Sequence, residues 1–150
     1  MSVVLGDARL TLGRTRAGQY DIVIADAFSS DAVPVHLLTR EAIAGYVRAL
    51  APQGIIAVHI TNRHMELEPV IAAVALENGL AARIRRDDRI PPSEVAATTR
   101  PPSVWVILAR SETDFGEIAA DKRWLPLRTR SDVPAWTDDF SNIVRVIKWH

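Results

Sequence analysis

The residues best placed to do chemistry are two aspartates that follow a short apolar run. Asp26 comes directly after the run 22–25, and Asp31 lies five residues further on, in a segment that also contains Ser29 and Ser30. A carboxylate at such a position can accept a proton from an amine or hold a cationic substrate. The alternative is structural, with Asp26 capping a loop through backbone N–H groups and Asp31 solvated. The pattern alone leaves both interpretations open.

A further carboxylate, Asp7, follows Gly6 near the start of the chain. An acidic residue after a strand is a common partner for the ribose or adenine of a nucleotide. The same residue would equally serve as the N-cap of a helix over residues 9–15. The sequence favours neither interpretation over the other.

The histidines and the absence of cysteine bear on metal and thiol chemistry. His59 and His64 are five residues apart, which fits no standard metal-binding pattern, so we expect His59 to be a hydrogen-bonded strand residue. The chain has no cysteine, which excludes disulfides, thiolate nucleophiles and cysteine-based metal sites. We predict no metal site.

Strands and helices alternate along the chain and would position these residues. Hydrophobic patterning predicts strands over residues 20–28, 54–60, 80–87 and 103–110, and helices over residues 37–50 and 65–79. The opening residues 1–9 are a further strand candidate that ends at Gly6 and Asp7. Residues 22–24 lack polar alternation, which is typical of a strand buried on both faces of a parallel sheet. The order predicts an α/β domain with a largely parallel sheet and ligands at the carboxyl ends of its strands.

Helix boundaries are indicated by three residues. Thr39 is a candidate N-cap for the first predicted helix. Pro69 suits the first turn of the second helix, and Gly79 suits its C-terminal end. These signals support the helix assignments independently of the hydrophobic pattern.

Length and composition indicate one soluble globular domain. The chain has 150 residues, of which 48% are apolar and 24% charged, and its 18 basic and 18 acidic residues give a net charge of zero. A neutral chain has no general attraction for nucleic acid or an anionic membrane. No apolar run is long enough to span a bilayer, and the first residues do not form a signal peptide. We therefore expect a cytoplasmic protein.

Residues 6–12, 20–42 and 50–62 resemble the second half of a spermidine synthase-like domain. The closing residues 136–149 are similar to the ending of bacterial members that are joined to, or encoded beside, a multi-pass membrane transporter-like region. The resemblance implies a partial class I methyltransferase (Rossmann-like) fold, whose full strand order is three-two-one-four-five-seven-six. Residues 1–150 would be one N-terminally truncated domain without the first strands and the glycine-rich cofactor turn.

The resemblance also implies a reaction. The family transfers an aminopropyl group from decarboxylated S-adenosylmethionine to a diamine such as putrescine, without a metal. Asp26 matches the carboxylate that holds and deprotonates the amine, and Asp31 matches a second carboxylate of the same loop. Ser29 and Ser30 lie in the loop that closes over the substrates.

The remaining matched positions concern the cofactor and the amine. Asp7 and Ala8 match residues that contact adenine. His59 stands close to where the family has a glutamine. An S-adenosylmethionine-dependent methyltransferase is the alternative reaction on the same fold.

The missing strands also predict partners. Without them the strand at residues 20–25 becomes a bare apolar edge, so we expect a homodimer or a separately supplied N-terminal half. The alternative to an enzyme is a non-catalytic module that docks on a membrane transporter-like partner, at the inner face of the membrane.

Overall fold

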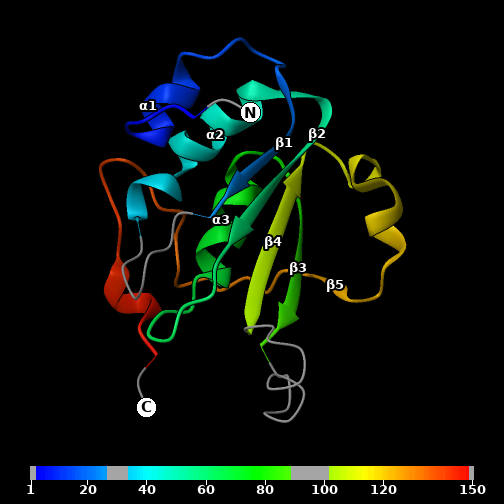
Figure 1. Ribbon diagram of the computed structural model, residues 1–150. Helices are drawn as coiled ribbons and strands as arrows, with labels where there is room; N and C mark the ends of the chain where they lie inside the picture. Colours follow the sequence, from blue (N-terminus) through cyan, green and yellow to red (C-terminus); the bar gives the residue numbers. More distant parts are fainter. Residues whose placement is uncertain (1–2, 27–33, 89–101, 149–150) are drawn as a thin grey trace.

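The computed structural model describes residues 3–26, 34–88 and 102–148 (Figure 1). Its elements in chain order are α1 (Ala8–Gly13), β1 (Tyr20–Ala25), the 3₁₀ helix η1 (Val35–Leu37), α2 (Arg40–Ala49), β2 (Leu50–His59), α3 (Glu68–Glu77), β3 (Ala81–Asp87), β4 (Ser103–Ala109), the 3₁₀ helix η2 (Glu112–Ala120), β5 (Trp124–Pro126) and the 3₁₀ helix η3 (Ile143–Val146). The alternation of strand and helix confirms the α/β class.

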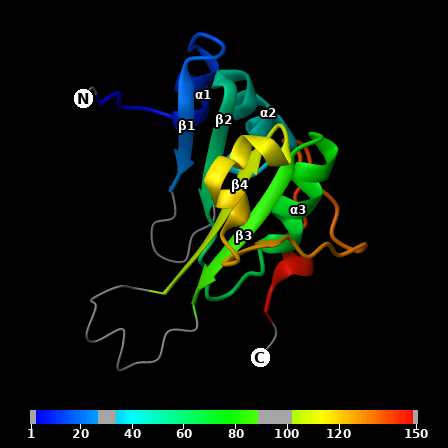
Figure 2. The same cartoon turned by 90° about the vertical axis from the view of Figure 1, so that its right-hand side faces the viewer.

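The described strands form one sheet in the order β1-β2-β4-β3-β5. β1 and β2 pair in parallel, whereas β4 lies antiparallel between β2 and β3. β1, β2 and β3 therefore run in the same direction (Figure 2), whereas β4 and β5 run opposite to them, so the described sheet mixes parallel and antiparallel pairs. The order β1-β2-β4-β3 reproduces the four-five-seven-six half of the expected sheet.

The prediction of a strand in the opening residues, ending at Gly6 and Asp7, is wrong for residues 3–9, the part of that stretch that the structure describes. Residues 3–5 have no regular structure and are largely exposed, and α1 begins at Ala8. Val3, Val4 and Leu5 have strand-forming side chains, but a strand also needs a neighbour to pair with, and β1 pairs with β2.

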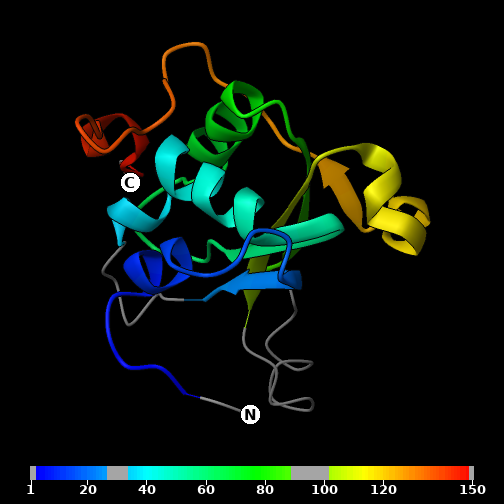
Figure 3. The ribbon, with the colours of Figure 1, turned by 90° about the horizontal axis from the view of Figure 1, so that it is seen from above.

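Helices α2 and α3 cover one face of the sheet, and α1 packs beside α2 (Figure 3). The boundary signals hold, since Thr39 accepts a hydrogen bond from the Ala42 amide at the start of α2. Pro69 lies in the first turn of α3, and Gly79 adopts a φ of 64° just beyond its end.

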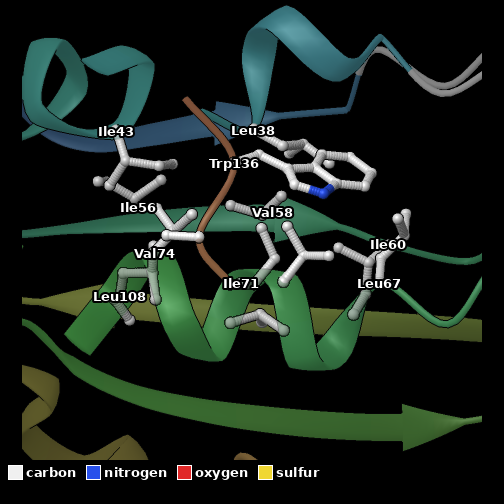
Figure 4. Packing of buried hydrophobic residues seen from close by; sticks show 14 of the residues in the cluster. Leu38, Ile43, Ile56, Val58, Ile60, Leu67, Ile71, Val74, Leu108 and Trp136 are labelled. Atoms are coloured by element: carbon white, nitrogen blue, oxygen red, sulfur yellow. The ribbon is translucent and has the colours of Figure 1, made fainter. Parts of the chain in front are cut away.

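The core lies between the sheet and these helices (Figure 4). Ile56 and Val58 of β2 and Leu108 of β4 face Val74 of α3 and are fully buried. Trp136, which comes from the C-terminal segment, enters the same core and is also fully buried. The C-terminal segment is therefore part of the domain's packing.

The opposite face of the sheet is covered only in part. Phe115 of η2 packs on Ile107 and Ala109 of β4. Ile22 and Ile24 of β1 remain 55% and 64% exposed. The expectation that β1 is buried on both faces is therefore wrong, because β1 is an edge strand and these two side chains point away from α2 and α3.

β2 begins four residues earlier than the sequence indicates, directly after α2. Tyr20 pairs with Leu50 and Ile22 with Ile55, so residues 51–54 form a bulge against β1. Gly54 fits this bulge because a Cβ there would lie 3.0 Å from the carbonyl oxygens of Tyr20 and Asp21.

Candidate functional site

Asp26 lies at the carboxyl end of β1, where the chain leaves the sheet. Its side chain is 53% exposed, and its Oδ1 lies 2.8 Å from Nδ1 of His59. His59 is the last residue of β2, and parallel pairing brings the ends of β1 and β2 to the same edge of the sheet (Figure 2). The structure thus brings together Asp26 and His59, which are 33 residues apart in the sequence.

His59 is held on three sides. Its Nε2 lies 2.6 Å from the Thr61 hydroxyl oxygen, which also accepts a hydrogen bond of 2.8 Å from the Val104 amide. Its ring stacks on Trp105 with centroids 4.7 Å apart and planes inclined by 17°. Because His59 and Trp105 are directly opposite in the β2·β4 ladder, the register of the sheet determines this stack. The prediction of a hydrogen-bonded strand histidine is confirmed.

Asp26 also lines a cleft of about 230 Å³ between α1, β1 and α2. Ala8 of α1 lines the same cleft, together with the apolar side chains of Leu12, Val23 and Leu37. Asp26 is the only acidic residue among the lining residues that the structure describes. A ligand with an apolar ring next to a cationic group would match this lining, with the ring against the apolar side chains and the cation near Asp26.

Tyr46 also lines the cleft and stays neutral. Burial raises the pKa of Tyr46 to about 12, and its hydroxyl donates a hydrogen bond of 3.2 Å to the Leu37 carbonyl. A phenol with this pKa is no proton acceptor near neutral pH. Among the described residues of the cleft wall, Asp26 is therefore the candidate proton acceptor.

Asp7 caps α1, as one of its two interpretations predicts. Its Oδ1 accepts hydrogen bonds from the amides of Arg9, at 2.8 Å, and Leu10, at 3.1 Å. The Leu10 hydrogen bond is the main cause that lowers the pKa of Asp7. Asp7 is adjacent to Ala8 in the chain but is not among the residues that line the cleft. A nucleotide role for Asp7 stays a prediction.

Three of the predicted site residues, Ser29, Ser30 and Asp31, lie outside the described residues. The part of the chain that the structure describes has no group of three or more His, Asp or Glu side chains arranged to hold a metal ion. Among the described residues, no helix has the length and apolar character needed to cross a membrane.

Helix α1 carries Ala8 to the cleft although none of its residues is buried. Leu12 of α1 is partly buried against the core, and polar contacts add to this attachment. Arg48 of α2 donates to the carbonyls of Leu12, Gly13 and Thr15, at 3.2, 2.7 and 3.1 Å. These contacts attach the end of α1 to α2.

The other attachment of α1 comes from the C-terminal segment. Arg9 donates to both carboxylate oxygens of Asp138, with 2.7 Å to Oδ1, and the Thr39 hydroxyl donates to the same Oδ1 at 2.8 Å. The Arg9 hydrogen bond is the main cause that lowers the pKa of Asp138. Asp138 thus links α1 to the start of α2.

Sequence reasoning missed Thr61, Trp105, Arg9 and Asp138. Period-two alternation in β4 puts Trp105 on the face opposite Val104 and Val106, which is a readable signal. The pairing of that face with His59 needs the strand register, which the sequence does not reveal. Arg9 and Asp138 are 129 residues apart, so no local pattern connects them.

The same arrangement of strands and helices occurs in larger proteins of known structure. A probable spermidine synthase from Corynebacterium glutamicum ATCC 13032 matches 93% of this chain with a TM-score of 0.60 and 18% sequence identity. The chain has a spermidine synthase-like fold. MNMC2 from Aquifex aeolicus matches 87% of the chain with a TM-score of 0.50 and 16% identity.

The spermidine synthase-like fold is present here in part. The chain spans about half the length of the first structure (55%) and about two fifths of the second (39%). No family model and no curated protein matches the sequence. At these identities the likeness extends to the fold, and within that fold Asp26 lies at the end of β1.

Proposed function

We propose that this chain is the amine-binding part of a spermidine synthase-like transferase. The observation that carries the proposal is Asp26, a carboxylate at the end of β1 that is bound by His59 and borders the apolar cleft beside Ala8. A carboxylate in this position attracts the ammonium group of a diamine and can accept its proton. Asp31 would add a second carboxylate in the same loop.

The proposed reaction is a direct displacement. Asp26 accepts a proton from the substrate ammonium, which leaves a neutral amine. The amine nitrogen forms a bond to the methylene carbon beside a sulfonium as the carbon–sulfur bond breaks, and the sulfur keeps the electron pair. Methylthioadenosine and an alkylated amine are the products. The protein contributes a proton acceptor and the alignment of nitrogen, carbon and sulfur.

We propose that the cleft holds the adenosyl part of such a co-substrate. Its wall is formed by Leu12, Val23 and Leu37, with Ala8 at the start of α1. Small-molecule sites are mostly apolar with a few placed polar groups, and Asp26 supplies the polar group here. Asp7 and Ala8 are the proposed adenine contacts, and Ser29 and Ser30 the proposed closing segment.

We further propose that a second polypeptide completes the sheet at β1. β1 is the edge strand, Ile22 and Ile24 are exposed on it, and the chain spans about half the length of the first matched structure. A separately supplied N-terminal half is the occupant that these observations favour, because it would add strands beyond β1. The chain alone would then be impaired in turnover.

The co-substrate class is tested by calorimetric titration of the purified chain. We expect heat with decarboxylated S-adenosylmethionine and with methylthioadenosine. Heat with S-adenosylmethionine alone would favour methyl transfer, the alternative reaction on this fold. No heat with any of the three would contradict both reactions and favour a cytoplasmic docking module for a membrane transporter-like protein.

A further inference from the structure

We propose that His59 is a positioning residue that orients Asp26 through an Nδ1–H hydrogen bond. The inference rests on the proposed function, in which Asp26 binds the amine. It adds a role for a residue that differs from the glutamine expected at this point.

The hydrogen bonds around His59 have one consistent direction. The Val104 amide donates to the Thr61 oxygen at 2.8 Å, so the Thr61 hydroxyl hydrogen is available to donate to Nε2 of His59 at 2.6 Å. A neutral imidazole that accepts at Nε2 carries its hydrogen on Nδ1. Nδ1 then donates to Oδ1 of Asp26 at 2.8 Å. Because a carboxylate has no hydrogen to donate, the contact with Asp26 requires the hydrogen on Nδ1 of His59, and the Thr61 hydroxyl can supply the matching donor at Nε2.

The ring cannot rotate freely to another arrangement. It stacks on Trp105, whose backbone is paired with that of His59 in the sheet. Rotation about the ring axis would break both the Thr61 and the Asp26 hydrogen bonds. The Nδ1–H group is therefore aimed at the end of β1 before any ligand binds, which is the arrangement that precise binding requires.

The consequence for Asp26 is an oriented carboxylate. Oδ1 is bound by His59, whereas Oδ2 accepts no hydrogen bond from the residues that the structure describes. A half-exposed aspartate without this contact would sample several rotamers and lose entropy on binding an amine. With the contact, one oxygen is held in place and the other is presented to the ammonium group.

Two substitutions distinguish the role of Nδ1 of His59 from that of Nε2. The amide nitrogen of asparagine occupies nearly the position of histidine Nδ1, whereas the longer glutamine side chain reaches the position of Nε2. His59→Asn therefore retains a donor to Asp26, and His59→Gln retains only the contact to Thr61. We expect His59→Asn to keep putrescine affinity within about threefold of the parent, and His59→Gln and His59→Ala to weaken it about tenfold or more. Methylthioadenosine affinity should change little in all three.

A spectroscopic measurement tests the inference independently of binding. Nitrogen-15 NMR of the parent chain at a pH where His59 is neutral should show the Nδ1–H tautomer. The Nε2–H tautomer, or equal putrescine affinity in all the variants, would overturn the inference and leave the proposed function in place. A parent chain that shows the Nδ1–H tautomer but binds neither putrescine nor methylthioadenosine would overturn the proposed function, and the positioning role with it.

Discussion

The two faces of the sheet carry similar side chains in very different surroundings. On the face beneath α2 and α3, Ile56 and Val58 are fully buried. On the other face, Ile22 and Ile24 of the neighbouring strand are more than half exposed. Residues of the same apolar type are therefore buried where α2 and α3 cover the sheet and exposed where the described residues leave β1 uncovered.

The candidate site lies where these two environments meet. Ile55, Ala57 and His59 alternate with the buried residues of β2 and therefore lie on the less covered face. The covered face supplies a rigid strand, and the open face leaves the end of that strand accessible. Rigid elements that present accessible side chains are typical of binding sites.

The largest expected effect is on the covered face. Trp136→Ala should lower the free energy of unfolding by about 3–5 kcal/mol, because a fully buried indole is replaced by a cavity. Urea denaturation followed by circular dichroism measures the change. A loss below about 1 kcal/mol would contradict the claim that the C-terminal segment is part of the core.

Trp136→Phe is the control for that experiment. The indole Nε1 of Trp136 is buried and has no hydrogen-bond partner among the described residues. Phenylalanine removes this unsatisfied group while keeping much of the apolar volume. The loss should therefore be clearly smaller than for alanine.

A smaller loss of stability is expected on removing Glu68, a buried carboxylate that connects α3 to the C-terminal segment. Glu68 at the start of α3 is 2% exposed and accepts hydrogen bonds from Arg86 and from the amide and guanidinium of Arg128. Glu68→Ala should cost about 1–3 kcal/mol, since the two arginines are partly solvated and keep water as a partner. Glu66→Ala, on the adjacent and more exposed carboxylate, is the matched control and should cost less in the same urea titration.

A polar substitution on the open face of the sheet should change stability much less than one on the covered face. Ile24→Ser should change the free energy of unfolding by no more than about 0.5 kcal/mol, whereas Val58→Ser should destabilise strongly. Sedimentation should show less self-association for Ile24→Ser than for the parent. A parent chain that sediments as a soluble monomer and unfolds cooperatively would contradict the need for a partner at β1.

The smallest effect concerns pH and the attachment of α1. The pKa of Asp138, lowered mainly by its hydrogen bond from Arg9, lies below the ordinary value of 3.8. A carboxyl group whose pKa is lower in the folded than in the unfolded state stabilises the fold at pH values above its unfolded-state pKa. This stabilisation is lost as pH falls from the unfolded-state pKa through the folded-state pKa. Thermal melting between pH 6 and 3 should therefore decline less steeply in Asp138→Asn than in the parent.

That decline should not vanish in the variant. Asp7 and Asp121 also have lowered pKa values, the latter at about 2 beside Arg123, so they contribute to the same acid loss. An unchanged slope in Asp138→Asn would show that its pairing with Arg9 contributes nothing measurable.

Much of the fold could be predicted from local sequence signals. The predictions that were wrong concern features that depend on contacts between distant residues. Thr39, Pro69 and Gly79 mark helix ends because capping is decided within a few residues. The early start of β2 depends instead on a bulge that packs Gly54 against β1. The strand predicted for the opening residues is absent from residues 3–9 for the same reason, because a strand needs a neighbour.

The site divides in the same way. The position of Asp26 at a strand end is local and could be predicted, whereas its contact with His59 depends on the parallel pairing of β1 and β2. The stack of His59 on Trp105 requires in addition that β4 inserts beside β2. Neither pairing is encoded in any short stretch of sequence.

The most direct test of the account is the affinity of the chain for putrescine, measured by calorimetry in the presence of methylthioadenosine. Asp26→Asn should weaken binding at least about tenfold, because the charged partner of the ammonium group is lost. Asp21→Asn, which removes an exposed carboxylate on the same strand, should bind like the parent. Equal affinity in Asp26→Asn and the parent would contradict the central claim that Asp26 receives the amine.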